Sequence, residues 1–288
     1  MSTSKPRVWP AFVAWGAAVT LGVFFAAPVL AVAIMLDLRG KKFATFDAIF
    51  AHLGEILEST GVLLASIAAN STAIILTCLL AARLTRAPGT PIASELRLGP
   101  SSLSALRTLG SSGGTLGISL AFFALIHLTG LEKYSVVSVM SDAFSKTSVP
   151  MAVVTVSLVG GLGPLGEELL FRGFMQPHFH RRWGRGWGIA ISAAAFGFTH
   201  LDPIQGTFAF AVGVYLGWLA TQAGSIRPSI LSHVVNNSFA VVLPRLSLPD
   251  GTIATLVTGA IGLALVAVAF VSVRRPVPPD PPTAIGGR

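Results

Sequence analysis

Long apolar segments recur along the whole chain and restrict its fold to one class. In lipid, each backbone polar group has to be satisfied within the protein, so spanning segments are helices or closed barrels. A spanning helix needs about 20 mostly apolar residues. By that measure we expect an all-α fold, a polytopic membrane helix bundle with about eight transmembrane helices. The expected spans are 9–35, 61–82, 110–131, 148–176, 186–201, 204–223, 228–245 and 252–273.

Charge and cysteine content agree with a membrane protein and exclude several other classes. Charged residues make up 11% of the chain, against about 25% in an ordinary soluble domain. The net charge of +8 comes from Lys and Arg residues between the apolar runs, not from one basic face, so we expect no nucleic-acid partner. The single cysteine, Cys78, lies within an apolar run, which leaves no intrachain disulfide and no paired-cysteine metal motif.

The distribution of Lys and Arg between the loops predicts the orientation. Positive residues are enriched on the cytoplasmic side of membrane proteins. With the N-terminus inside, thirteen lie on the inner side and six on the outer side. The inner set is Lys5, Arg7, Arg83, Arg86, Arg97, Arg107, Arg181, Arg182, Arg185, Arg227, Arg274, Arg275 and Arg288, and the outer set is Arg39, Lys41, Lys42, Lys133, Lys146 and Arg245. We therefore predict a multi-pass protein of the cell membrane with both termini in the cytoplasm.

The domain organisation is expected to be simple. Residues 1–273 are predicted to form a single integral membrane domain, in which the mixed segment 37–60 forms an interfacial helix. The Pro-rich segment 274–288 is predicted to be a disordered cytoplasmic tail.

Three ionisable residues lie within the fourth expected span. Such residues are costly at membrane depth and indicate a functional site by default. Glu168 and Arg172 are four residues apart, so they share a helix face and are predicted to form an ion pair. The adjacent Glu167 points about 100° away and has no local cation. A carboxylate of this kind, facing a polar cavity, suits a general base that activates water.

His200 in the fifth span is the expected partner of Glu167. Glu167 lies fifteen residues before Arg182, and His200 lies fifteen residues after Arg185. In a hairpin that turns at Arg181 to Arg185, both stand about 22 Å above the turn. His200 can then orient the same water or protonate the leaving amine, and Phe196, one turn earlier, is expected to wall the pocket against lipid.

The seventh span contributes His233 and Asn237, four residues apart on one face. They are expected to donate hydrogen bonds to a developing oxyanion. His233, however, stands only about 9 Å above Arg227, far short of the depth expected for Glu167. Either the loop before Pro228 dips inward, or the site lies nearer the cytoplasm than the hairpin count indicates.

These three motifs together resemble the CPBP (CAAX protease/Abi) family of intramembrane proteases, which includes the CAAX prenyl endopeptidases. Glu167 to Arg172 matches EExxxR, Phe196 to His200 matches FxxxH, and His233 to Asn237 matches HxxxN. The resemblance covers about 150–240. It implies an intramembrane endopeptidase that cuts a membrane-associated protein or peptide. Glu167 is then the catalytic base, His200 its partner, and His233 with Asn237 the oxyanion side, supported by Glu168, Arg172 and Phe196.

Three alternatives remain open from the residues alone. A zinc-dependent version would use Glu167, His200 and His233, but HExxH is absent and asparagine is a poor zinc ligand, so we expect no cofactor. A serine mechanism has only Gly110 to Gly113, which fits GxSG but is better explained as a helix start. A non-enzymatic immunity protein or transporter would keep the same polar residues for packing or ligand binding.

Overall fold

The computed structural model describes residues 7–39, 41, 45, 48, 59–246 and 251–274. In this part of the chain the regular structure is helical, without a strand. The predicted all-α membrane bundle is therefore confirmed. Most of 37–60 and all of 275–288, where an interfacial helix and a disordered tail were predicted, lie outside the described residues.

From α5 onward, the described helices follow one another with few residues between them. Their bounds are α1 (Trp9–Leu38), α3 (Thr60–Thr85), α4 (Ile92–Glu95), α5 (Ala105–Thr129), η1 (Leu131–Tyr134), α6 (Val136–Ser145), α7 (Val149–Thr155), η2 (Val156–Leu162), α8 (Gly163–Glu168), η3 (Leu169–Met175), α9 (Gln176–Phe198), α10 (Pro203–Ala223), α11 (Arg227–Val242), η4 (Leu243–Arg245) and α12 (Thr252–Val273). Side-chain caps begin four of them: Ser59, Ser104, Ser148 and Asp202 each accept a hydrogen bond from the first-turn backbone. Such caps satisfy amide groups that have no partner within the helix.

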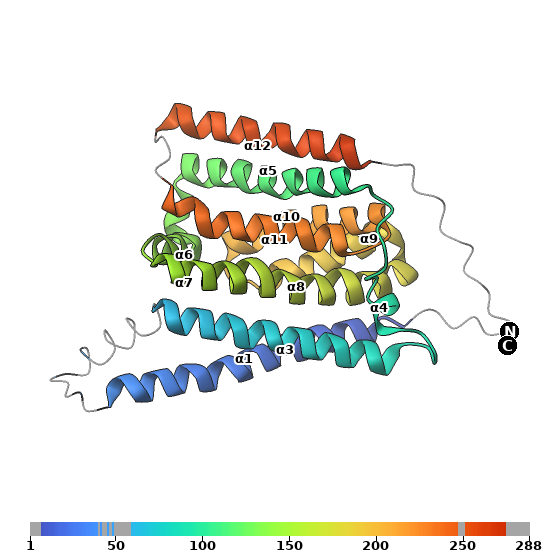
Figure 1. The fold of residues 1–288 in the computed structure, drawn as a ribbon, viewed down its shortest axis with the longest axis horizontal. Coiled ribbons are helices and arrows are strands. Elements are labelled where there is room, and N and C mark those ends of the chain that lie inside the picture. The colour runs from blue at the N-terminus through green and yellow to red at the C-terminus, as the bar shows by residue number, and fades with distance from the viewer. Residues whose placement is uncertain are drawn as a thin grey trace, which may run out of the picture.

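The bundle has a central group of helices flanked by two helix pairs (Figure 1). α1 packs with α3 on one side and α5 packs with α12 on the other, while α7 to α11 lie between them. α5 and α12 approach closely through glycines, since a methyl group at Gly117 would lie 2.4 Å from the carbonyl oxygen of Gly262. Small residues at such contacts allow helix backbones to pack tightly in a membrane.

The fourth and fifth expected spans form a continuous run of helix from Val149 to Phe198, broken at one residue. Gly184 has φ +81° and ψ 172°, a conformation that glycine tolerates and other residues avoid. The chain reverses there, which confirms the predicted turn between Arg181 and Arg185. The helix entering the turn is longer than the predicted 148–176 because it continues past Met175 into α9.

Two stretches of this run are π-helical, and two prolines account for them. In η2 the amide of Gly163 bonds to the carbonyl of Leu158, and in η3 the amide of Gln176 bonds to the carbonyl of Phe171. Both bonds span five residues instead of four. The next residue in each case is a proline, Pro164 or Pro177, which lacks an N–H and prevents the regular α-helical bond.

Among the described residues, five helical segments are long and apolar enough to cross a membrane: Thr60–Thr85, Ala105–Thr129, Val149–Phe198, Pro203–Ala223 and Thr252–Val273. The third of these contains the reversal at Gly184. All eight expected spans correspond to helices, but the count of eight crossings stays a prediction.

Candidate functional site

A buried ion pair lies at the centre of the bundle. Arg172 Nη1 and Glu168 Oε1 are 2.6 Å apart, and neither side chain is exposed. Arg172 also donates from Nη2 to the carbonyl of Gly213, 3.2 Å away, and its Cζ lies 4.6 Å from the ring centroid of Phe196. The predicted pair is therefore confirmed, and Arg172 gains two further partners that offset the cost of burying a cation.

Gln176 adds a second side-chain contact with the backbone of α10, next to that of Arg172. It lies four residues beyond Arg172 and donates from Nε2 to the carbonyl of Gly217, 2.9 Å away. Gly213 and Gly217 leave room for these side chains, because a methyl group would lie 3.2 Å from Arg172 Nη2 or 2.6 Å from Gln176 Oε1. Sequence reasoning missed Gln176, although its spacing continues the series from Glu168 and Arg172.

His233 lies between the two glutamates. Its Nδ1 is 3.0 Å from Glu168 Oε1, and its Nε2 is 3.6 Å from Glu167 Oε2. The Glu168 carboxylate accepts, so His233 Nδ1 is assigned as the donor. The Glu167 side chain is 22% exposed, whereas those of Glu168 and His233 are 0% and 3% exposed. Glu167 is thus the accessible carboxylate, and its nearest ionisable partner is this histidine.

The depth of His233 agrees with the first of the two explanations given for its spacing, an inward-dipping loop. In the connection before α11, Ser225 and Ile226 are fully buried, and the amide of Ile226 donates to the carbonyl of Arg97. A methyl group at Gly173 would lie 3.4 Å from Cδ1 of Ile226, so the side chain of Ile226 reaches η3 at Gly173. Gly173 is eleven residues before Gly184, which places the connection about 16 Å inside the turn.

Heights estimated from this contact by counting residues agree with each other. Glu167 lies six residues from Gly173 and His233 lies seven residues from Ile226, or about 9 and 10 Å. The apparent conflict in depth arose from the assumption that Arg227 stands level with the Arg181 to Arg185 turn.

Asn237 lies one helical turn beyond His233 on α11. Its Nδ2 donates to the carbonyl of Val159 at 3.3 Å. That carbonyl belongs to η2, where its partner at a five-residue spacing would be Pro164, which has no N–H. The proline therefore leaves an acceptor that the asparagine side chain satisfies.

Phe196 and His200 reach the cluster from α9. Phe196 is 2% exposed and packs edge-on against His200 and His233, with ring centroids 5.0 and 5.7 Å apart. It is therefore packed at the centre of the cluster, and its expected role as a wall between the pocket and lipid stays a prediction. Nδ1 of His200 lies 3.0 Å from the carbonyl of Phe196. Within the described part of the chain, no hydrogen bond or ion pair joins His200 to Glu167.

The cluster also contains residue types that can bind a metal ion, namely histidine and glutamate. Among the residues that the structure describes, no three His, Cys, Asp or Glu side chains are grouped so that they could hold a metal ion. Glu167 and His233 approach each other, but His200 does not complete a set of three, and Nδ1 of His233 already faces Glu168. The arrangement described here does not fit the alternative zinc site.

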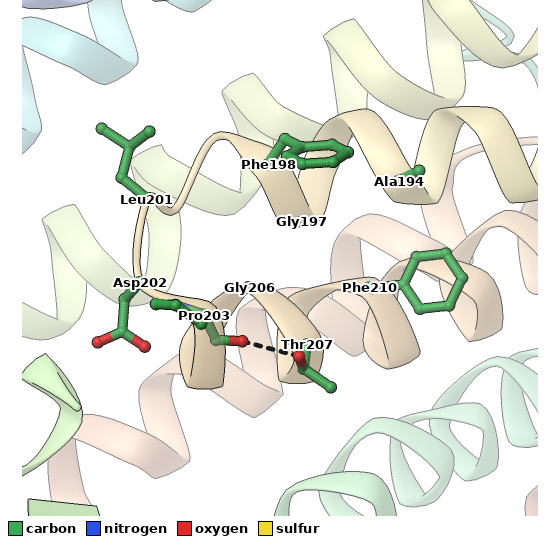
Figure 2. A pocket seen from close by; sticks show the side chains of 9 residues that line it. All are labelled: Ala194, Gly197, Phe198, Leu201, Asp202, Pro203, Gly206, Thr207 and Phe210. Carbon is green, nitrogen blue, oxygen red and sulfur yellow. Dashed lines mark hydrogen bonds between the residues drawn. The ribbon is translucent and has the colours of Figure 1, made fainter. Parts of the chain in front are cut away.

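An apolar groove of about 560 Å³ lies beside this cluster, between α9 and α10 (Figure 2). Gly197 and Leu201, which line it, directly follow Phe196 and His200 in the sequence. Because successive helical residues point about 100° apart, the groove lies on another side of α9 from these two rings. The motif residues do not line it.

Comparison with known protein families identifies the region around the cluster. Residues 148–239 match the family model described as "Type II CAAX prenyl endopeptidase Rce1-like". The matched range is less than half of the chain, but it contains every residue of the three motifs, and it confirms the family resemblance found in the sequence. No curated protein and no solved structure matches the chain.

Proposed function

We propose that this chain, in which residues 148–239 belong to an Rce1-like family of endopeptidases, hydrolyses a peptide bond of a membrane-associated protein or peptide by means of glutamate-activated water. The observation that carries the proposal is the contact of Glu167 with His233 beside a sealed Glu168–Arg172 pair. This contact brings the EExxxR and HxxxN motifs, which are far apart in the chain, together at the accessible carboxylate of Glu167.

Glu167 acts as the general base in this proposal. It is the more exposed of the two glutamates, so water can reach it. Glu168 is already engaged by Arg172 and His233. Its role is to hold His233 and to keep the pair neutral, since an unpaired charge at this depth is costly.

His233 and Asn237 form the oxyanion side. Nε2 of His233 faces Glu167 at 3.6 Å and is the first proposed donor, and Nδ2 of Asn237, one turn away, is the second. Removal of one such donor typically lowers kcat by about 10² to 10³-fold. His200 is proposed to orient the water or protonate the leaving amine.

The proposed substrate class is a C-terminal CAAX segment with a lipid modification, from the description of the matched family. The test uses the full chain in nanodiscs with a fluorogenic farnesylated CAAX peptide and with the same peptide lacking the farnesyl group. We expect cleavage of the farnesylated peptide. Cleavage of neither peptide would contradict the prenyl endopeptidase proposal and favour the non-enzymatic alternative, an immunity protein or transporter.

A further inference from the structure

A line of polar side chains runs from Ser119 on α5 through Asn236 to Asn237. Ser119 and Asn236 belong to none of the three motifs. The hydroxyl of Ser119 donates to Oδ1 of Asn236 at 2.6 Å. Nδ2 of Asn236 donates to Oδ1 of Asn237 at 3.2 Å. Nδ2 of Asn237 in turn donates to the carbonyl of Val159 at 3.3 Å. Asn236 is 2% exposed, whereas Ser119 and Asn237 are partly exposed, so the line leads from one partly exposed end to the other through a buried asparagine.

The donors in this line all point the same way. Because Oδ1 of Asn236 accepts from Ser119, its Nδ2 is the end directed at Asn237. The carboxamide of Asn237 is then held by its oxygen, and its N–H group is directed away from Asn236. A line of hydrogen bonds in one direction strengthens each member.

Asn237 needs such a restraint if it is to act as a donor. The terminal torsion of an asparagine is broad and roughly two-fold, so a carboxamide without neighbours turns over easily. The reversed carboxamide would present an oxygen to a developing oxyanion and repel it. The backbone of α11 alone does not select between the two orientations.

We propose that Ser119 and Asn236 are positioning residues that fix the Asn237 carboxamide with its N–H directed at the oxyanion. This inference rests on the proposed function, in which Asn237 stabilises that charge. The weak 3.3 Å bond to Val159 keeps the donor in place until the stronger acceptor forms.

The test is kinetic and uses the full chain in nanodiscs with the farnesylated reporter peptide. Ser119→Ala should lower kcat by about 3 to 10-fold with little change in KM, the factor that corresponds to losing one hydrogen bond. Asn236→Asp replaces the donor by a second acceptor, so the Asn237 carboxamide should turn over. We expect kcat of this variant to fall by about 10²-fold, close to the loss in Asn237→Ala.

A matched control lies one turn away on the same helix interface. Thr115, four residues before Ser119, bonds through Oγ1 to the hydroxyl and the carbonyl of Ser232, four residues before Asn236. Thr115→Val removes hydrogen bonds between the same two helices, α5 and α11, and leaves the partners of Asn237 in place. We expect it to lower thermal stability as Ser119→Ala does, but to leave kcat per folded molecule near that of the wild type.

Combined variants distinguish positioning from general packing. If Ser119 acts only through Asn237, adding Ser119→Ala to Asn237→Ala should not lower kcat further. Additive losses, or an equal loss of kcat in Thr115→Val, would overturn the inference. If Asn237→Ala itself leaves kcat unchanged, the proposed oxyanion role of Asn237 fails. If only the Ser119 and Asn236 variants leave kcat unchanged, the positioning role fails alone.

Discussion

Glu167 and Glu168 are adjacent in the sequence but lie in different surroundings. Glu167 is partly exposed and has one long contact with His233, whereas Glu168 is sealed between Arg172 and His233. Glu167→Gln preserves shape but cannot accept a proton from water. We therefore expect activity on the reporter peptide to fall by about 10² to 10⁴-fold, with an unchanged melting temperature. Activity near wild type would exclude Glu167 as the base.

Substitution of Glu168 should mainly lower stability, whereas substitution of Glu167 should mainly lower activity. Glu168→Gln leaves Arg172 charged and without its carboxylate in the bundle, which costs about 3 to 5 kcal/mol in a typical buried pair. The melting temperature should fall clearly, and activity should fall largely with the folded fraction. Thermal unfolding in detergent, measured together with activity per folded molecule, checks this.

The double variant Glu168→Gln with Arg172→Gln is the control. Removal of both charges should recover part of the lost stability, because no unpaired charge remains. If Glu168→Gln abolished activity per folded molecule while Glu167→Gln did not, the roles proposed for the two glutamates would be reversed.

The arrangement of the candidate metal ligands also leads to a prediction about zinc. Because Glu167, His200 and His233 are not grouped as three ligands, we propose that catalysis needs no zinc. The purified protein should contain substoichiometric zinc and keep its activity after prolonged chelation. Stoichiometric zinc, with activity that is lost on removal and regained on addition, would indicate a metal-dependent mechanism.

At the scale of residues, sequence spacing predicted the contact between side chains on one helix but not the contacts between side chains on different helices. The Glu168–Arg172 pair followed from a four-residue interval. The approach of His233 to both glutamates could not be obtained in this way, because it depends on how far the connection before α11 dips into the bundle. Ser119 gave no sequence signal, since its partner Asn236 lies 117 residues away.

At the scale of elements, glycines decide how closely α9 and α10 approach. A methyl group at Gly197 would lie 2.7 Å from the backbone carbonyl of Gly206 and 3.3 Å from Cβ of Phe210. A backbone atom cannot turn aside as a flexible side chain can. The two helices would therefore separate close to His200, which follows three residues after Gly197.

Gly197→Ala should therefore lower both stability and activity. We expect a loss of about 1 to 3 kcal/mol from overpacking and a lower activity per folded molecule. Gly16→Ala in α1 is the control, because nothing lies within 4 Å of the added methyl group and a helical Gly→Ala change is usually stabilising. Equal melting temperatures for the two variants would contradict the close packing described for α9 and α10.

The sequence predicted the positions of the helices better than their internal geometry. Apolar length located every helix that was expected to span the membrane, and the Arg-rich stretch located the turn at Gly184. The π-helical stretches were not predicted, although Pro164 and Pro177 explain them afterwards. A proline in a helix shows where a hydrogen bond is lost, but the neighbouring helices determine whether the helix bends, ends or widens.

At the scale of the whole molecule, the Arg-rich turn and the connection between α4 and α5 lie at the same end of the bundle. Burial, followed by the nearby charge of Arg185, lowers the pKa of Arg97 in that connection. In Figure 1, α1 begins and α12 ends at this end of the bundle. Among the described Lys and Arg residues counted on the inner side, most lie in or beside the helix ends and connections at this end, so we propose that this end faces the cytoplasm.

Cysteine labelling tests that orientation in a background in which buried Cys78 is replaced by serine. Trp183→Cys marks the Arg-rich turn, and Tyr134→Cys marks η1, between α5 and α6 beside Lys133; both parent side chains are exposed. A membrane-impermeant maleimide should label Tyr134→Cys in right-side-out vesicles and Trp183→Cys in inside-out vesicles, because the charge bias sets the turn inside. The reverse pattern would show that the bundle is inserted the other way. Labelling of both positions from one side would contradict their location at opposite ends of the bundle.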